Sequence, residues 1–234
     1  MKNKFIGFYD YTVILTFVSL LSTILGMTQA IDGHFRIALM CLAISGLCDT
    51  FDGKIARTKK DRDNDHKLYG IQLDSLCDVV CFGAFPVMIC YLMGVHGLLG
   101  GLVCVYYCIC GVIRLGWFNV LETDKLSSDA PGEKVYHGLP ITTIVVILPL
   151  TFLLSFVVRD AVFPHILTAM LFVTGTLFIV DFQIRKPKNW VIFLLIGIVG
   201  VAVLTVLLFS RLQIGRRSTD NVPLIDVISN YEDE

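Results

Sequence analysis

Long apolar stretches alternate with polar connections along most of the chain. The stretches lie near residues 11–30, 35–57, 69–93, 97–121, 139–158, 161–180 and 190–210. Each is close to the roughly 20 apolar residues that an α-helix needs to cross the hydrocarbon core of a bilayer. The pattern predicts an all-α integral membrane protein with seven hydrophobic spans and no separable soluble domain.

Composition also indicates that the membrane is the main solvent. Hydrophobic residues make up 55% of the 234 residues and charged residues 17%, which is too apolar for a soluble domain of this length. The net charge of -1 gives no general attraction to nucleic acid, so we expect no such partner. The eight cysteines form no C-x-x-C pair, so neither a disulfide framework nor a zinc site is predicted.

Basic residues gather in alternate connections, which indicates how the chain is oriented. Lysines and arginines lie at the N-terminus and in the longer connections 58–68, 122–137 and 181–189. The positive-inside rule predicts that these segments face the cytoplasm. No cleavage site follows the first apolar stretch, so we expect a retained helix rather than a signal peptide. A seventh crossing would leave a basic tail outside, and the sequence leaves the topology of this last span open.

Four aspartates lie within or at the ends of the second and third predicted helices. Asp49 and Asp52 are spaced i, i+3, while Asp74 and Asp78 are spaced i, i+4, so each pair shares a helix face. An antiparallel helix pair would bring the two faces together at one membrane depth. Each carboxylate costs about 2.5–3.5 kcal/mol at the bilayer centre, so the cluster needs compensation. Hard divalent cations such as Mg²⁺ or Mn²⁺ suit clustered carboxylates.

Small residues and one arginine accompany the aspartates. Gly53, Ala56 and Gly70 leave room either for a bulky ligand or for close helix packing. Arg57 can pair with a phosphate or reach the membrane interface. Carboxylates for two metals, a cation for phosphate and room for a planar group together describe a site for a nucleotide diphosphate. Because the site opens at the membrane surface, the other substituent of that diphosphate is expected to be a lipid.

These positions resemble the signature of the CDP-alcohol phosphotransferase family, which reads D-x-x-D-G-x-x-A-R, a spacer, then G-x-x-x-D-x-x-x-D. All eight signature positions match, although the spacer at 58–69 is longer than usual in the family. The resemblance implies a six-helix catalytic core at 11–180, usually in a homodimer. An N-terminal segment 1–10, a loop with an additional C-terminal span at 181–210 and a polar tail at 211–234 would complete the chain.

The resemblance also implies a role for each matching residue. Two divalent cations, Mg²⁺ or Mn²⁺, would be held by Asp49, Asp52, Asp74 and Asp78, and Asp78 would also be the general base. The CDP-lipid would contact Asp49, Gly53, Ala56, Arg57 and Gly70. A multi-pass protein of the cytoplasmic membrane is expected, with its active site facing the cytoplasm.

Two further segments concern the acceptor alcohol. Residues 113–119 read IRLGWFN and residues 136–142 read YHGLPIT. Both resemble the phosphatidylserine synthase branch of the family, although Gly116 and Trp117 stand where an Ala-Arg pair is common. The resemblance implies transfer of a phosphatidyl group from CDP-diacylglycerol to L-serine, with Arg114 and Asn119 binding the acceptor. Arg114 suits a serine carboxylate, but it can instead neutralise an aspartate of the site.

Three alternatives remain open. An acceptor of the glycerol 3-phosphate or inositol type is one, although a phosphate-bearing acceptor favours a denser cationic cluster than Arg114 provides. A divalent-cation or proton-coupled transporter also places carboxylates within the membrane, but no inverted repeat is visible. A non-catalytic scaffold would leave the four aspartates unexplained.

Overall fold

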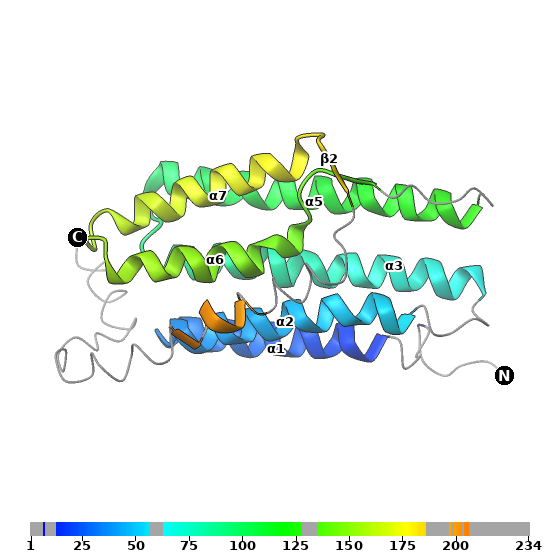
Figure 1. The fold of residues 1–234 in the computed structure, drawn as a ribbon, viewed down its shortest axis with the longest axis horizontal. Coiled ribbons are helices and arrows are strands. Elements are labelled where there is room, and N and C mark those ends of the chain that lie inside the picture. Colours follow the sequence, from blue (N-terminus) through cyan, green and yellow to red (C-terminus); the bar gives the residue numbers. More distant parts are fainter. Residues whose placement is uncertain are drawn as a thin grey trace, which may run out of the picture.

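The computed structural model describes residues 7, 13–56, 63–127, 135–185, 197, 199–202 and 204–205. Within these ranges, long helices run side by side as a bundle (Figure 1). They are α1 (Ile14–Ile31), α2 (Phe35–Ala56), α3 (Asn64–Asp78), α4 (Phe85–Leu92), α5 (Gly97–Ser127), α6 (Ile144–Leu153) and α7 (Phe163–Ile179). A π-helix (Val79–Ala84) joins α3 to α4 without a break, and 3-10 turns at Ile141–Thr143 and Leu154–Phe156 flank α6.

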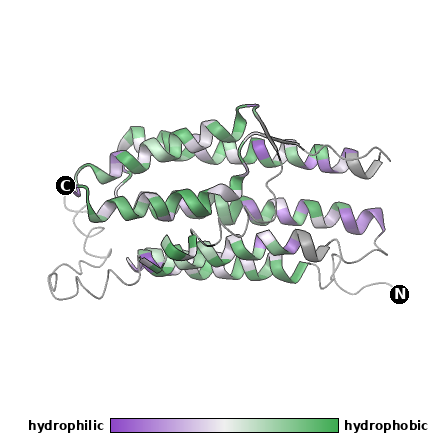
Figure 2. Cartoon of the chain, viewed as in Figure 1, coloured by the Kyte–Doolittle hydropathy of each residue, from purple (hydrophilic) through white to green (hydrophobic). Residues whose placement is uncertain are grey.

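Several helical segments have the length and composition of membrane spans. Among the described residues, Ile14–Ile31, Asn64–Leu92 and Gly97–Asp124 are each long and apolar enough to cross a bilayer, and Ile141–Phe156 and Phe163–Ile179 are shorter apolar helices. Hydrophobic residues cover most of the bundle (Figure 2). Many large apolar side chains point outward, for example Leu98 with an exposed fraction of 82%. The protein is a mainly α-helical integral membrane protein, as the hydropathy pattern predicts.

Two helices extend beyond the predicted spans at the polar end of the bundle. The third span begins at Asn64 rather than near residue 69, and α5 continues to Ser127 rather than ending near residue 121. Hydropathy alone ends both too early because the added turns are polar, as Figure 2 shows for the start of α3. Asp65 lies in the first turn of α3, where a negative charge is favourable to the helix dipole. The seventh predicted span and the tail lie largely outside the described residues.

A short antiparallel ribbon ties together two connections that the sequence pattern predicts only as loops. Strand β1 (Val135–His137) pairs with β2 (Gln183–Arg185), with Val135 opposite Arg185. Gly138 follows β1 at a φ of 69°, and a Cβ there would lie 3.1 Å from the Phe178 carbonyl oxygen. Glycine is therefore required where the chain turns from the ribbon toward α6.

Small residues bring α1 and α2 close together. The buried residues of α1 are Thr16, Ser19, Ser22, Thr23, Gly26 and Ala30. The hydroxyl groups of Ser19 and Ser45 lie 2.6 Å apart across the helix pair. A Cβ added at Gly26 would lie 2.5 Å from the Phe85 ring and 2.7 Å from Cβ of Cys41. Small residues and hydroxyl groups allow such close packing of membrane helices, so α2 is firmly held where it carries its aspartates.

Two neighbouring tyrosines of α5 have different partners. The fully buried Tyr107 packs its ring against Phe178, with ring centroids 5.3 Å apart. Tyr106 stacks on Phe172 of α7, also at 5.3 Å, and its hydroxyl lies 3.1 Å from the Thr176 hydroxyl. Both rings therefore contact α7, but the Tyr106 hydroxyl also bonds α7, whereas the Tyr107 hydroxyl bonds the π-helix that follows α3.

Candidate active site

The four predicted aspartates come together where α2 meets the span that begins with α3. Asp49, Asp74 and Asp78 each offer a carboxylate oxygen, and these three oxygens lie within 4.8 Å of one another. The side chains of Asp49 and Asp78 lie within hydrogen-bonding reach of each other, and so do those of Asp52 and Asp74. The two acidic helix faces therefore meet across the helix pair.

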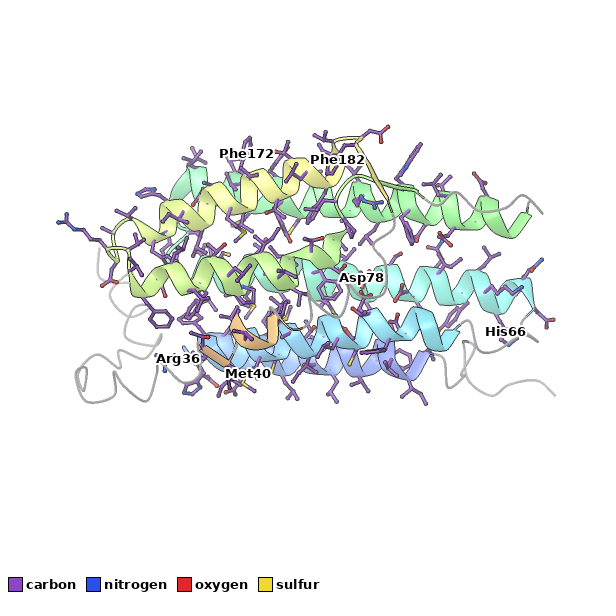
Figure 3. The ribbon with its side chains drawn as sticks, viewed as in Figure 1. Arg36, Met40, His66, Asp78, Phe172 and Phe182 are labelled. Carbon is purple, nitrogen blue, oxygen red and sulfur yellow. The ribbon has the colours of Figure 1, made fainter. Side chains whose placement is uncertain are left out.

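The cluster lies inside the bundle rather than at its polar tip. Asp78 is 14 residues beyond Asn64, or about 21 Å along the helix axis. Figure 3 shows Asp78 within the bundle and His66 far away near the start of α3. Asp52 is buried, with an exposed fraction of 7%, and Thr16 of α1 donates a hydrogen bond of 3.4 Å to its Oδ2. A third helix therefore orients this carboxylate.

The donor set fits a hard divalent cation. Mg²⁺ binds oxygen at about 2.0–2.1 Å, so oxygens on opposite sides of the ion lie about 4 Å apart. The spacing of the three carboxylate oxygens, within 4.8 Å, matches this after small side-chain movements. Carboxylates this close repel one another, and a cation between them converts the repulsion into attraction. A ligand set that consists only of oxygen atoms favours Mg²⁺ or Mn²⁺ over softer metals.

The backbone changes its helical form directly after Asp78. Residues Val79–Ala84 form a π-helix, and the N–H of Phe85 bonds the Val80 carbonyl five residues earlier. Such π-helical turns are rare and frequently lie at functional sites. The Tyr107 hydroxyl donates to the Phe82 carbonyl at 2.8 Å. The sequence pattern does not reveal this turn, because the segment reads as an ordinary apolar helix.

The residues predicted to contact the CDP group are described only in part. Gly53 and Ala56 belong to the C-terminal end of α2, after Asp52, while Arg57 lies outside the described residues. Gly70 lies one turn before Asp74 on α3, and a Cβ added there would meet nothing within 4 Å. The helix surface at Gly70 is therefore open, which agrees with the room that the sequence predicts beside this helix.

Arg114, one of the two predicted acceptor residues, is buried in α5 with an exposed fraction of 8%. Its Nε donates a hydrogen bond of 3.2 Å to the Leu139 carbonyl, and its guanidinium carbon lies 5.9 Å from the centroid of the Phe118 ring. The hydrogen bond links the two segments, 113–119 and 136–142, that the sequence singles out for the acceptor. The guanidinium group is therefore fixed in orientation.

Asn119, the other predicted acceptor residue, bonds side chains of α3. Its Oδ1 accepts a hydrogen bond of 2.6 Å from the Ser75 hydroxyl, and its Nδ2 donates to Gln72 Oε1 at 3.4 Å. Ser75 follows Asp74 directly and is buried. Nothing in the sequence pattern identified Ser75, because a single serine beside an aspartate carries no recognisable signal.

An open groove of about 370 Å³ lies beside this hydrogen-bond network. It is lined by Gln72, Gly116, Asn119, Val120, Thr123 and Asp124. None of the four clustered aspartates lines it.

Fold and site together define an integral membrane protein with an acidic cluster suited to divalent cations. The sequence model of the CDP-alcohol phosphatidyltransferase family matches residues 11–181. The chain belongs to this family, whose members generally depend on divalent metals.

The matches to curated relatives cover part of this chain and part of each relative. The CDP-diacylglycerol–serine O-phosphatidyltransferase of Saccharomyces cerevisiae is 33% identical over 146 residues, 61% of this chain and 48% of the yeast protein. An archaetidylserine synthase of Methanothermobacter thermautotrophicus is 31% identical, covering 66% of this chain and 62% of that protein. A CDP-diacylglycerol–serine O-phosphatidyltransferase of Helicobacter pylori is 30% identical, covering 63% and 59%. The matches thus span about half to three fifths of these relatives. No solved structure matches the chain.

Replacing Asp49 by asparagine tests whether the cluster binds metal. The change removes one carboxylate charge at nearly constant shape, and we expect the affinity for Mn²⁺ to fall at least about tenfold, since even indirect partners of a ligand contribute that much. Titration of the detergent-purified protein, followed by the EPR signal of free Mn²⁺, measures the affinity. The control Asp65→Asn alters an exposed carboxylate on α3 and should leave it unchanged. Equal affinity in Asp49→Asn and the unmodified protein would exclude Asp49 as a ligand.

Proposed function

We propose that this protein transfers the phosphatidyl group of CDP-diacylglycerol to the hydroxyl of L-serine and releases phosphatidylserine and CMP. The observation that carries the proposal is the meeting of both halves of the family signature in one carboxylate cluster. Serine is the part that the names of the relatives share, because the yeast and Helicobacter proteins are serine O-phosphatidyltransferases and the archaeal one is an archaetidylserine synthase. In this proposal the core at 11–180 carries the reaction and its site opens toward the cytoplasm, where the basic connections lie.

The donor would bind between α2 and α3. Two divalent cations, Mg²⁺ or Mn²⁺, held by Asp49, Asp52, Asp74 and Asp78, would neutralise charge on the diphosphate and on the departing CMP. The CDP group would lie along Asp49, Gly53, Ala56, Arg57 and Gly70. The open surface of α3 at Gly70 supports this placement, and a planar guanidinium such as that of Arg57 suits a phosphate.

Asp78 would take the proton of the acceptor. The serine hydroxyl oxygen forms a bond to the phosphorus that bears the lipid, the bond from that phosphorus to the CMP oxygen breaks, and the hydroxyl proton passes to the Asp78 carboxylate. A carboxylate oxygen of Asp78 lies within 4.8 Å of oxygens of Asp49 and Asp74. Holding the reactants in this geometry would supply much of the rate enhancement.

Arg114 would bind the acceptor. Arg114 has its guanidinium plane fixed by the Leu139 carbonyl, and a fixed guanidinium is a strong ligand for a carboxylate. Such a charge favours an amino acid over an uncharged polyol. Asn119, the other residue predicted to bind the acceptor, lies five residues further along α5, where its side chain bonds Ser75.

The acceptor assignment is tested by CMP release from detergent-purified protein supplied with CDP-diacylglycerol and Mn²⁺ or Mg²⁺. We expect release with L-serine and at most background release with glycerol 3-phosphate or myo-inositol, because Arg114 complements the serine carboxylate. Release only with one of the other alcohols would overturn serine and leave the metal site in place. If none of these alcohols supports CMP release from protein that still binds Mn²⁺ and CDP, the result would favour the transporter alternative.

A variant of Arg114 serves as the control for this assay. Arg114→Lys keeps the positive charge but loses the planar fork, so the KM for serine should rise far more than the KM for CDP-diacylglycerol. Equal rises in both KM values would indicate that Arg114 acts on the CDP-lipid or on the carboxylates rather than on serine.

Asp78→Asn tests the general base. The amide cannot accept the hydroxyl proton as a carboxylate does, so kcat should fall by about 10²–10⁴-fold, the usual contribution of general base catalysis. CMP release is measured at saturating Mn²⁺, which offsets any loss of metal affinity, and thermal unfolding in detergent confirms that the variant folds. Turnover close to that of the unmodified protein would refute the assignment.

The same family resemblance leads us to propose a homodimer. The outward face of α5 carries an apolar stripe, including Leu102, Val105, Ile109 and Val112, each at least half exposed. Either lipid or a second copy can cover such a face. Light scattering with subtraction of the detergent contribution should give a mass of two 26.1 kDa chains. A mass of one chain in mild detergent and in nanodiscs would exclude the dimer.

A further inference from the structure

Helix α5 bonds the carboxylate-bearing span on both sides of Asp78. On one side, the Ser75 hydroxyl bonds Asn119 at 2.6 Å. On the other side, the Phe82 carbonyl accepts from the Tyr107 hydroxyl at 2.8 Å. Asp78 lies between Ser75 and Phe82 in the chain. Ser75 and Tyr107 are buried, with exposed fractions of 7% and 0%. The Tyr107 bond is therefore shielded from bulk water, whereas the Ser75–Asn119 bond is partly buried.

The Ser75 bond constrains the acidic face directly. Successive residues of an α-helix are about 100° apart, so Ser75 lies about 100° around the axis from Asp74 and about 60° from Asp78. Ser75 therefore flanks the acidic face, on the side that turns toward α5. A hydrogen bond at this position limits rotation of α3 about its axis, and rotation would swing both carboxylates away from α2.

The Tyr107 bond acts on the π-helical turn that follows Asp78. The π-helix has one more residue per hydrogen-bonded ring than an α-helix. Its position therefore sets the rotation and depth of the helical residues that follow it. Tyr107 donates to a carbonyl inside this turn. The neighbouring Cys108 thiol lies 3.8 Å from the Gly83 carbonyl, the next one along. Two successive side chains of α5 thus lie against two successive carbonyl groups of the turn.

Arg114 lies on α5 between these two contacts. It is five residues before Asn119, or roughly 8 Å, while Asp78 is three residues beyond Ser75, or roughly 5 Å. The Ser75–Asn119 contact places Asn119 level with Ser75, and α5 runs in the opposite direction to α3 because Tyr107, earlier in α5, contacts Phe82, later in its span. Arg114 and Asp78 are therefore held at similar depth.

We propose that Tyr107 and the Ser75–Asn119 pair are positioning residues that hold the span carrying Asp74 and Asp78 in register with α5. The register sets the depth of Asp78 relative to Arg114 and the rotation of the acidic face relative to α2. This inference rests on the proposed function and adds to it a role for three side chains that touch neither metal nor substrate. Asn119 then acts through Ser75 rather than by contact with the acceptor.

Adjacent tyrosines provide a matched test. Tyr107→Phe and Tyr106→Phe each remove one hydroxyl from neighbouring positions of α5, but the Tyr106 hydroxyl bonds Thr176 of α7. Displacement of reacting groups by about 1 Å can lower the rate by about 100-fold, so we expect kcat for CMP release to fall about 10- to 100-fold in Tyr107→Phe. The KM for CDP-diacylglycerol should change less than kcat, and Tyr106→Phe should stay within about twofold of the unmodified protein. Equal kcat values in the two variants would overturn the role of Tyr107.

The second pair is tested by combining substitutions. Ser75→Ala and Asn119→Leu should each lower kcat. The double variant should lose no more than the worse single variant, because both changes break the Ser75–Asn119 bond, and Asn119→Leu also removes the bond to Gln72. Ser75→Thr keeps the hydroxyl and should restore most of the rate. If the two losses multiply and Asn119→Leu alone raises the KM for serine, Asn119 binds the acceptor and its positioning role is wrong.

Mn²⁺ affinity provides a readout that does not depend on the acceptor. Loss of register should weaken Mn²⁺ binding about tenfold in Tyr107→Phe, as loss of an indirect partner of a ligand does, and leave Tyr106→Phe unchanged. If the unmodified protein fails to use serine, the acceptor assignment fails while this comparison still decides the register. Equal Mn²⁺ affinities together with equal unfolding temperatures would overturn the inference.

Discussion

Repulsion among the clustered carboxylates is the interaction on which the rest of the structure depends. Three of them present oxygens within 4.8 Å of one another, and the fourth, Asp52, reaches Asp74. Inside a bundle surrounded by lipid, water cannot screen such charges as it does at a protein surface. The helices that carry the carboxylates must therefore be held together by other contacts until a cation fills the space between them. The firm packing of α1 on α2 and the bonds from α5 to the α3 span provide those contacts.

The chemistry of these contacts follows from the membrane. Lipid tails are as apolar as leucine side chains, so apolar burial gives little preference for one helix arrangement over another. Directional hydrogen bonds and close approach at small residues supply that preference. Accordingly, the hydroxyl groups of Ser19 and Ser45 join α1 to α2 near the site, and the close contact at Gly26 joins the two helices further along, beside Phe85. The more distant core, around Phe85, Ile89 and Leu148, is filled by large apolar side chains.

Local patterns in the sequence predicted most of the helices and predicted that the four aspartates would come together. Hydropathy over 20 residues and a spacing of three or four residues are both properties of a single segment, so they can be read without a fold. The polar starts and ends of helices, such as the first turns of α3, could not be predicted because their helical form is sustained by the rest of the helix. Ser75 and Tyr107 were missed for a different reason. Their importance arises from partners 44 and 25 residues away, and no local pattern records such pairs.

The depth of the carboxylates also suits the proposed CDP-lipid substrate, whose two parts have opposite solvent preferences. A CDP-lipid carries a nucleotide that favours water and acyl chains that favour the bilayer, with the diphosphate between them. The polar first turns of α3 and the polar end of α5 extend beyond the apolar part of the bundle (Figure 2), and Asp74 and Asp78 lie where polar turns give way to the apolar π-helix and α4. A diphosphate bound there would keep the nucleotide among the polar turns and the acyl chains in lipid. Carboxylates further along the span would force the nucleotide into the hydrocarbon core, and carboxylates nearer to Asn64 would draw the acyl chains into water. The position of the aspartates along the helix is therefore as much a requirement of the proposed reaction as their number.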